Sequence, residues 1–338
     1  MTSTGSKIRA YQLDKLGGLD GLVLAEREMP SPSAGEVLVK VKASSLNSRD
    51  TMILNGAYPA PVPSGRVPLS DGAGEVVEVG AGVKRFKVGD RVINSFFPNF
   101  FGGSFNFMPE QWVVDHDGWL TEYKAVSAEA LVAMPEHLTF EEAATLPCVA
   151  VTAWSALSGV RAGDTVLTQG TGGVSLFALQ LAKALGARVI ATTTNPESTA
   201  RLRELGAGEV IDVRDLPAWG DQVRALTSGR GVDRVVEVGG PGTLAQSIKA
   251  VAYGGQVSLV GALAADGGGM DFWSVFMSQA RFQPIATGSR RDLEDLCRLM
   301  EQHQIRPVID SVYSFDDAKA GWSHYAGGKV TGKVVFRH

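Results

Sequence analysis

The glycine-rich turn in "VLTQGTGGVSLFALQLAKALG" carries the clearest sign of chemistry in the sequence. A strand pattern runs through Gly170, Gly172 and Gly173 directly into a helical pattern. Around Val174, backbone amides and a helix amino terminus can face a pyrophosphate, because no Cβ blocks its approach. Ser175 replaces the last glycine of G-x-G-x-x-G, so the predicted nucleotide site depends on the strand and helix around the turn. A tight turn without a ligand is the alternative.

The end of the next strand pattern, "RVIATTT", bears on the choice of cofactor. NAD-specific sites usually place an acid here to bind the ribose 2′-hydroxyl, but this chain has Thr192, Thr193 and Thr194. A 2′-phosphate would not be repelled, so NADP(H) is favoured over NAD(H). Arg201 and Arg203 could neutralise that phosphate, although arginines on helices are more often solvated.

Two later segments end predicted parallel strands on the side where such sheets bind ligands. They are "EVGG" at 237–240 and "LVGAL" at 259–263. Both are predicted to contact the cofactor, through Gly239, Val260, Gly261, Ala262 and Leu263.

Metal ligands are scarce in the chain. Its two cysteines, Cys148 and Cys297, are too few for a disulfide framework or a four-cysteine zinc site, and they fit a reducing compartment. The five histidines show no metal-binding spacing and fit surface or structural roles. Cys148 fits a small buried residue better than a nucleophile, because no pairing with a histidine is indicated.

The elements that position these residues change in type near residue 130. Before it, β patterns such as "EVLVKVKAS" and "GAGEVVEVG" are separated by turn signals, which predicts a mainly antiparallel β domain. After it, strand and helix patterns alternate, which predicts an α/β fold with a doubly wound parallel sheet. In this part "GTLAQSIKAVAYGG" predicts a helix over 242–255 and "QVSLVGAL" a strand over 256–263. The terminal "KVTGKVVFRH" returns to a β pattern and is expected to pair with the first domain.

Length and composition describe an ordinary globular protein. The chain has 338 residues, which allows about two packed domains. Its net charge is −4 and its basic residues are scattered among acids, so nucleic acid is not expected as a partner. No apolar run reaches the roughly 18 residues of a membrane span, and the amino terminus has no secretion signal. We therefore expect a cytoplasmic protein with a small-molecule partner and no membrane partner.

Several motifs in a fixed order resemble the medium-chain dehydrogenase/reductase superfamily over nearly the whole chain. They are "GEVLVKVKASSLNSRD", "PLSDGAGEVVEVGAGVKRFKVGDRV", "AATLPCVAVTAW", the glycine-rich turn with its helix, "GVDRVVEVGGPGTL" and the terminal "GKVVF". Within the superfamily, the chain is similar to the zinc-independent quinone oxidoreductase branch.

The resemblance implies a GroES-like catalytic domain over residues 1–131 and a Rossmann cofactor-binding domain over residues 132–289. It implies that a carboxyl-terminal segment, residues 290–338, returns to the catalytic domain. Because family members commonly dimerise through the edge of the Rossmann sheet, a homodimer is expected. The family also places a hydroxyl near the nicotinamide, here Thr152, and Lys333 is expected to reach the cofactor.

The zinc alcohol dehydrogenases of this superfamily carry their ligands at positions that differ here. The corresponding residues are Asn47, Ser70 and Asp71, with Cys148 or a neighbour at the remaining position. This set does not supply the roughly three ligands that a catalytic zinc needs. The four-cysteine structural lobe is replaced by an aromatic, glycine-bearing loop over 96–120. Its Phe-rich part, from Phe96 to Trp112, could be a substrate wall or lid, or equally a packed dimer contact.

Two catalytic residues are expected from the same comparison. Tyr58 matches a tyrosine that in enoyl thioester reductases of the superfamily acts as a proton donor or substrate anchor; packing of a loop is the alternative. Asn47, in the cysteine position, is expected to donate its amide to the substrate oxygen or the nicotinamide ribose, and a turn asparagine is the alternative. Arg49 and Asp50 fit a structural pair or an interdomain contact.

Three classes of function follow. The first is a zinc-independent NAD(P)H-dependent oxidoreductase that reduces quinones or α,β-unsaturated carbonyl compounds by hydride transfer, because these electrophiles need no Lewis acid. The second is an alcohol or carbonyl dehydrogenase of the same superfamily. The third is a non-enzymatic nucleotide-binding structural protein.

Overall fold

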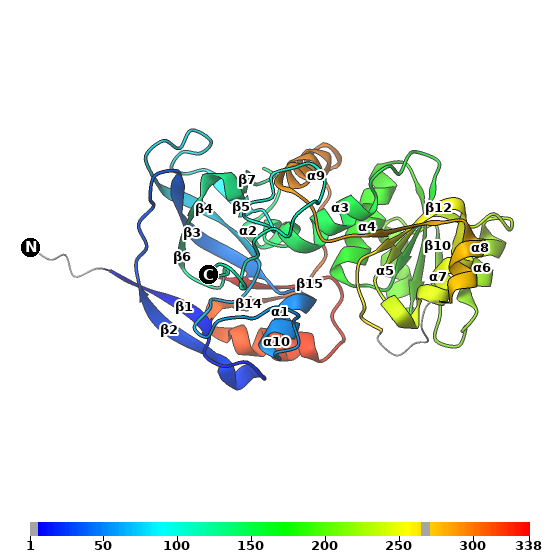
Figure 1. Cartoon of the computed structure of the whole chain (residues 1–338), viewed down its shortest axis with the longest axis horizontal. Coiled ribbons are helices and arrows are strands. Elements are labelled where there is room, and N and C mark those ends of the chain that lie inside the picture. The colour runs from blue at the N-terminus through cyan, green and yellow to red at the C-terminus, as the bar shows by residue number, and fades with distance from the viewer. Residues whose placement is uncertain (1–5, 265–270) are drawn as a thin grey trace, which may run out of the picture. The chain divides into compact units, whose positions relative to one another are not determined.

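The computed structural model describes residues 6–264 and 271–338 and divides the chain into two compact units. Unit 1 comprises Met1–Val151 with Gly288–His338, and unit 2 comprises Thr152–Thr287. Figure 1 labels their elements. The stretch 132–151, expected in the cofactor-binding domain, packs with unit 1.

Unit 1 is built on a seven-stranded, mostly antiparallel sheet with a separate hairpin. The sheet runs in the order β14-β15-β3-β4-β5-β7, with β6 also paired to β3, and the hairpin joins β1 to β2. The strands are β1 (Lys7–Leu13), β2 (Leu22–Glu28), β3 (Glu36–Ser45), β4 (Asp71–Val79), β5 (Arg91–Asn94), β6 (Tyr123–Ser127), β7 (Leu131–Ala133), β14 (Ile309–Ser314) and β15 (Lys333–Arg337). The helices are α1 (Ser48–Leu54), α2 (Phe140–Ala143), a π-helical turn (Leu146–Ala150), α9 (Arg290–His303) and α10 (Ala318–Ala326).

The last strand returns to the first part of the chain, as the sequence predicts. β15 pairs antiparallel with β3, with Val335 opposite Ser45 and Arg337 opposite Ala43. This pairing brings the start of β15 close to the end of β3, where α1 begins. Residues nearly 300 positions apart therefore meet at one point of the sheet, as the hydrogen bond between Lys333 and Leu46 shows.

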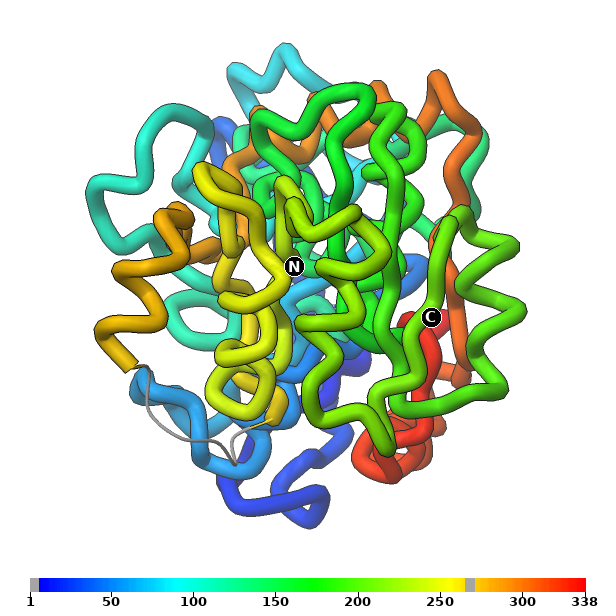
Figure 2. The backbone as a smooth tube through the Cα atoms, turned by 90° about the vertical axis from the view of Figure 1, so that its right-hand side faces the viewer, coloured from blue at the N-terminus to red at the C-terminus, as the bar shows by residue number. Residues whose placement is uncertain are grey.

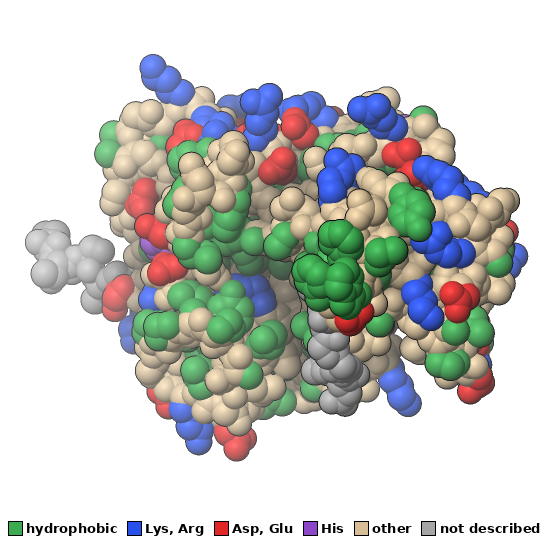
Figure 3. Space-filling model, turned by 45° about the vertical axis from the view of Figure 1, so that its right-hand side comes forward, with side chains coloured by type: hydrophobic (Ala, Val, Ile, Leu, Met, Phe, Trp, Pro, Cys, Tyr) green, Lys and Arg blue, Asp and Glu red, His purple; other side chains and the backbone are tan. Residues whose placement is uncertain are grey.

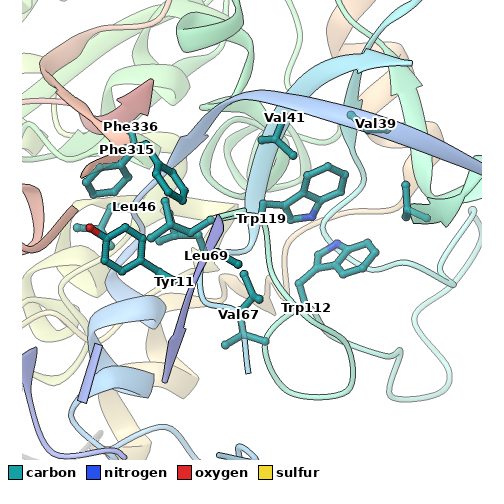
Figure 4. Packing of buried hydrophobic residues seen from close by; sticks show 14 of the residues in the cluster. Tyr11, Val39, Val41, Leu46, Val67, Leu69, Trp112, Trp119, Phe315 and Phe336 are labelled. Carbon is teal, nitrogen blue, oxygen red and sulfur yellow. The ribbon is translucent and has the colours of Figure 1, made fainter. Parts of the chain in front are cut away.

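Two tryptophans anchor the core of unit 1 (Figure 4). Trp112 and Trp119 meet edge to face, with ring centroids 5.7 Å apart, a favourable aromatic geometry. A Cβ on Gly72 would lie 2.4 Å from the Trp119 ring, so only glycine fits beside it. Because Gly72 follows Asp71 at the start of β4, the core fixes the backbone that carries this acid.

Unit 2 is a parallel sheet with helices on both faces. The strand order is β10-β9-β8-β11-β12-β13 and every pairing is parallel, the order of a Rossmann fold. Helices α4 and α5 cover one face and α6, α7 and α8 the other (Figure 1), and Figure 2 looks onto the unit from the side of α6 and α8. The strands are β8 (Thr165–Gln169), β9 (Arg188–Thr193), β10 (Glu209–Asp212), β11 (Val232–Glu237), β12 (Val251–Leu259) and β13 (Arg281–Pro284). The helices are α3 (Val151–Ala156), α4 (Gly173–Ala184), α5 (Thr199–Leu205), α6 (Trp219–Leu226), α7 (Leu244–Ala250) and α8 (Phe272–Ser278).

The predicted fold class is confirmed, with one shifted boundary. The helix expected over 242–255 ends at Ala250, and β12 already begins at Val251. Val251 pairs with Val232 of β11, and Gly254 has a φ of +74°, which marks an irregular start of the strand. Strand pairing and burial of Val251 thus override the helical pattern.

Exposed hydrophobic side chains gather in several groups on the face shown in Figure 3. Helix α8 alone contributes four large ones, between 52% and 68% exposed: Phe272, Trp273, Phe276 and Met277. Among the described residues, no helix combines the length and the apolar character needed to cross a membrane.

Candidate active site

The glycine-rich turn of unit 2 joins β8 to α4. Gly170 has a φ of +73°, a conformation that favours glycine, and its amide donates to the Thr192 carbonyl at 2.8 Å. Gly172 precedes the helix, and a Cβ built on it would have no atom within 4 Å, so the space in front of the turn is open. The amides of the first helical turn, from Gly173 and Val174 onward, lack helical partners there.

Ser175 explains the imperfect fingerprint. Its side chain is buried, and its hydroxyl donates to the Gln169 carbonyl at 2.6 Å. The Ser175 side chain therefore bonds the backbone at the end of β8. In the usual fingerprint, the glycine at this position allows the helix to pack closely against the strand. The turn keeps its shape although the last glycine is missing.

A buried carboxylate holds the neighbouring loop in place. Glu237, fully buried at the end of β11, accepts from the amides of Gly239 at 2.8 Å and Gly240 at 2.9 Å. It also accepts from Gln169 Nε2 at 2.9 Å, which ties the ends of β8 and β11 together. Thr243 Oγ1 and Ser247 Oγ donate to the same carboxylate. A carboxylate with five donors is stable in the interior without a cationic partner.

The loop after β12 packs on this arrangement. Val260 N donates to the Glu237 carbonyl at 2.8 Å. A Cβ on Gly261 would approach Val238 O at 2.7 Å, and one on Gly240 would lie 2.7 Å from the Ala262 Cα. Leu263 of this loop is 68% exposed. The structure thus brings the predicted cofactor residues after β11 and β12 together at the carboxyl edge of the sheet.

The three threonines at the end of β9 differ in accessibility. Thr192 and Thr193 are buried, and the Thr193 hydroxyl donates to the Asn195 carbonyl at 3.0 Å. Thr194 is exposed. Of the three, only Thr194 presents its side chain to solvent, and no carboxylate occupies the strand end. Thr152 is buried in α3 of the same unit.

A dinucleotide fits unit 2. The open space at Gly172, the free amides of the first turn of α4 and the ordered loops after β11 and β12 lie where Rossmann sheets bind pyrophosphate and nicotinamide. Gly170, Gly172, Gly173 and Val174 would hold the pyrophosphate.

The second group of candidate residues lies in unit 1, where α1 starts after β3. Asn47 precedes the helix, and its amide N–H donates to the Asp50 carboxylate at 2.9 Å, a helix-capping contact. The side chain of Asn47 is buried and donates Nδ2 to Asp71 Oδ2 at 2.8 Å. Its Oδ1 accepts a bond from the Lys333 ammonium. The amide is thus held from both ends.

Lys333 is a buried cation at the centre of this group. Its Nζ donates to the Leu46 carbonyl at 2.5 Å and to Asn47, and lies 3.6 Å from Asp71 Oδ2. The side chains of Lys333 and Asp71 are 3% and 0% exposed. Ser45 Oγ donates to Asp71 Oδ2 at 2.9 Å, whereas Asp71 Oδ1 has no hydrogen-bond partner. The predicted contact of Lys333 with the cofactor stays a prediction.

Burial controls the protonation of these acids. It raises the pKa of Asp71 to about 6, and the nearby charge of Lys333 opposes the rise. Burial also raises the pKa of Asp50, against the attraction of Arg49. The pKa of the Cys148 thiol is raised by burial and by the negative charge of Asp71. The thiol therefore stays protonated at neutral pH.

A catalytic zinc does not fit these residues. The positive charge that a zinc would supply is already present as the Lys333 ammonium, bonded to Asn47 and Leu46. Within residues 6–264 and 271–338, no three His, Cys, Asp or Glu side chains are grouped as a metal site.

Tyr58, the predicted proton donor, lies in a third cluster of unit 1. Its hydroxyl donates to Gln111 Oε1 at 2.7 Å, and Arg49 Nη2 donates to the same oxygen at 3.1 Å. The Arg49 guanidinium lies over the Tyr58 ring, 4.8 Å from its centroid, and over the Phe96 ring at 5.1 Å. All three polar residues are half-buried.

The expected direct pair of Arg49 with Asp50 is replaced by a bridge. Arg49 Nη1 donates to Ser70 Oγ, and Ser70 Oγ donates to Asp50 Oδ1 at 3.2 Å. Arg49 Nη1 also bonds the Trp112 carbonyl at 3.2 Å. The aromatic loop thus reaches the cluster through Phe96, Gln111 and Trp112. Sequence reasoning missed Gln111 and Glu237 as site residues, because no local spacing links either residue to its partners.

Two protein-family models match two separate parts of the chain. Residues 33–136 match the alcohol dehydrogenase GroES-like domain, and residues 173–302 match the zinc-binding dehydrogenase family. A zinc-type alcohol dehydrogenase-like protein of Schizosaccharomyces pombe is 39% identical over 336 residues, covering 96% of this chain and 97% of that protein. A chloroplastic quinone oxidoreductase of Triphysaria versicolor is 31% identical and covers 98% of both chains.

A solved structure of an NAD-dependent alcohol dehydrogenase superposes with a TM-score of 0.90 at 33% identity, covering 98% of this chain and 99% of that one. Both units and their order in the chain are shared with these proteins. The chain belongs to the medium-chain dehydrogenase/reductase superfamily and is an NAD(P)-dependent oxidoreductase.

Proposed function

We propose that the protein is a zinc-independent NADPH-dependent reductase of quinones and α,β-unsaturated carbonyl compounds. One observation supports the proposal: the Lys333 ammonium is bonded to Asn47 and paired with Asp71, two residues that match zinc-ligand positions of the zinc alcohol dehydrogenases. A buried, fully engaged ammonium cannot accept an alkoxide as an open metal position does. Conjugated electrophiles need no such acid, because their own oxygen takes up the charge.

When bound, the dinucleotide supplies the hydride. Tyr58 then acts on the electrophile as a hydrogen-bond donor or proton donor, since its phenol is half-buried and already donates to a carbonyl oxygen. Asn47 is held by Lys333 and Asp71, so its role is to keep the start of α1 in one conformation or to donate its remaining N–H. The proposed roles of Tyr58 and Asn47 are argued only from contacts within unit 1.

NADPH is proposed over NADH because of the end of β9. Thr194 is exposed there, and the strand end carries no acid that would repel a 2′-phosphate. Arg201 is exposed and bonded to Glu204 at 3.1 Å, so it is partly neutralised and supports the phosphate only weakly. The preference for NADPH is therefore argued mainly from the lack of an acidic side chain that would repel the 2′-phosphate at the end of β9.

A homodimer is also proposed. β13 ends the sheet of unit 2 and leaves an edge that a second copy could extend. The four exposed apolar side chains of α8, the helix that precedes β13, would gain burial in such an assembly. No nucleic-acid or membrane partner is proposed.

The test is turnover of a small panel with NADPH and NADH: an enone, a quinone and a simple alcohol with the oxidised cofactors. Tyr58→Phe should lower kcat for the enone by about ten-fold or more with little change in cofactor affinity. Alcohol dehydrogenation is the second candidate, favoured by the name of the Schizosaccharomyces pombe relative. About one tightly bound zinc per subunit, with activity lost in chelator, would favour it and would overturn the proposal.

A further inference from the structure

The Gln111 side-chain oxygen occupies a position where two donors converge. Tyr58 Oη lies 2.7 Å and Arg49 Nη2 3.1 Å from Gln111 Oε1. Arginine carries only donors, so the atom facing it must be the amide oxygen, and Tyr58 must then be the second donor. One neutral carbonyl oxygen thus accepts from a cation and from a phenol.

We infer that Arg49 and Tyr58 form an oxyanion site for the substrate carbonyl, and that Gln111 occupies this site until substrate replaces it. Donors at 2.7–3.1 Å from a developing negative charge are the geometry that stabilises an enolate. The inference rests on the proposed function and adds Arg49 as a catalytic residue and Gln111 as an internal competitor.

The surroundings hold Arg49 in a fixed position. Its other terminal nitrogen bonds Ser70 Oγ and the Trp112 carbonyl, and Ser70 passes the contact on to Asp50. The guanidinium plane is flanked by the Tyr58 and Phe96 rings. No carboxylate contacts it directly among the described residues, so its charge is not cancelled by a direct ion pair. A preorganised cation stabilises new negative charge without reorganisation.

Gln111 can leave more easily than either donor. It lies outside helices and strands, in the aromatic loop 96–120, and its side chain makes no other hydrogen bond in the described structure. An amide oxygen is a weaker acceptor than an enolate, because hydrogen bonds to charged groups are the stronger ones. Substrate oxygen would therefore replace it as charge develops.

In the reaction, hydride adds to the β-carbon of the enone, the C=C pair moves toward the carbonyl carbon, and the C=O pair moves onto oxygen. Arg49 and Tyr58 both donate to that oxygen. Tyr58 then transfers its proton to the enolate oxygen, and the phenolate is reprotonated from water. The resulting enol takes a proton from water at its α-carbon and returns the hydroxyl proton to water. The products are the saturated carbonyl compound and oxidised dinucleotide, so charge and atoms balance.

Opposite substitutions of Gln111 test the inference. Gln111→Met keeps the length of the side chain but removes the competing oxygen, whereas Gln111→Glu places a carboxylate against Arg49 and closes the site. The probe is 4-nitrophenolate, an oxyanion whose absorbance reports its binding without turnover. Gln222→Met, an exposed glutamine of α6, is the matched control.

Gln111→Met should tighten 4-nitrophenolate binding by about three- to ten-fold, the range for one lost competing hydrogen bond. Gln111→Glu and Arg49→Gln should each weaken it by about ten-fold or more. KM for the enone should follow the same order. Equal effects of Gln111→Met and Gln111→Glu, or none, would overturn the inference, because a purely structural glutamine gives no opposite shifts. The affinity for 4-nitrophenolate could follow the predicted order while no enone or quinone is turned over. That result would support the oxyanion site and contradict the proposed reductase function.

Discussion

Replacing Lys333 by methionine removes the cation of a buried pair and keeps most of the side-chain volume. Two acceptors lose their donor, the Leu46 carbonyl and Asn47 Oδ1, and Asp71 loses its ion-pair partner. Because the side chain is 3% exposed, water cannot replace the ammonium without reorganising the site. The substitution therefore destabilises the fold by leaving buried polar groups without partners, and solvent does not compensate for this loss.

The size of the effect depends on pH. Asp71 has a pKa of about 6 with Lys333 present. Since burial raises it above that of the unfolded chain, this group makes folding less favourable as pH rises from about 4 to about 6. In Lys333→Met the carboxyl keeps its proton beyond pH 6, so each further pH unit costs the variant about 1.4 kcal/mol relative to the wild-type protein. The lost hydrogen bonds add about 0.5–1.5 kcal/mol each at any pH.

At pH 7 we expect a loss of about 2.5–4.5 kcal/mol in the free energy of unfolding, close to the range for breaking a buried ion pair. Urea denaturation at pH 6, 7 and 8 measures it, with the exposed Lys84→Met as control. The additional substitution Asp71→Asn should remove the pH-dependent part. A destabilisation that stays constant from pH 6 to 8 would refute the pairing of Lys333 with Asp71.

Three further results are expected. Gly172→Val fills the open space in front of α4 and should abolish cofactor binding in a folded protein, which titration of NADPH fluorescence measures; unchanged affinity would remove the pyrophosphate from this turn. Glu237→Gln should weaken NADPH binding by about ten-fold, because one of the donors to the buried carboxylate then meets an N–H; an equal affinity would mean that the loop after β11 does not contact the cofactor. Phe276→Ser should shift the protein toward a monomer in light scattering if α8 lies in a dimer interface, and an unchanged mass would contradict that assignment.

The sequence predicts those parts of the fold whose signal is local. The turn at Gly170–Val174 follows from a strand, glycines and a helix in one continuous run, and it forms as expected. The return of β15 to the first domain follows from a β pattern in the right superfamily order. The local pattern gives a wrong prediction at Val251. The helical pattern continues through this residue, but its backbone pairs with β11 and forms a strand.

The candidate site is harder to predict because its contacts are long-range. Lys333 meets Asn47 over 286 positions, and Gln111 meets Tyr58 over 53. No periodicity records such pairs, and a buried cation among apolar neighbours is unexpected from composition. The sequence indicates that zinc ligands are missing, but it does not reveal that a buried ammonium bonds Leu46 and Asn47 there.

The discontinuity of unit 1 has a consequence for biosynthesis. Unit 2 is continuous in sequence and can close as soon as it leaves the ribosome, whereas the end of β3, residues 43–45, has one edge unpaired until β15 has been made. During this interval the nascent chain exposes a strand edge that favours association with other chains. His338 is part of this last step, because its half-buried ring bonds Ser44 Oγ at 2.9 Å. Any segment fused directly after β15 would therefore act on the strand that completes the sheet of unit 1.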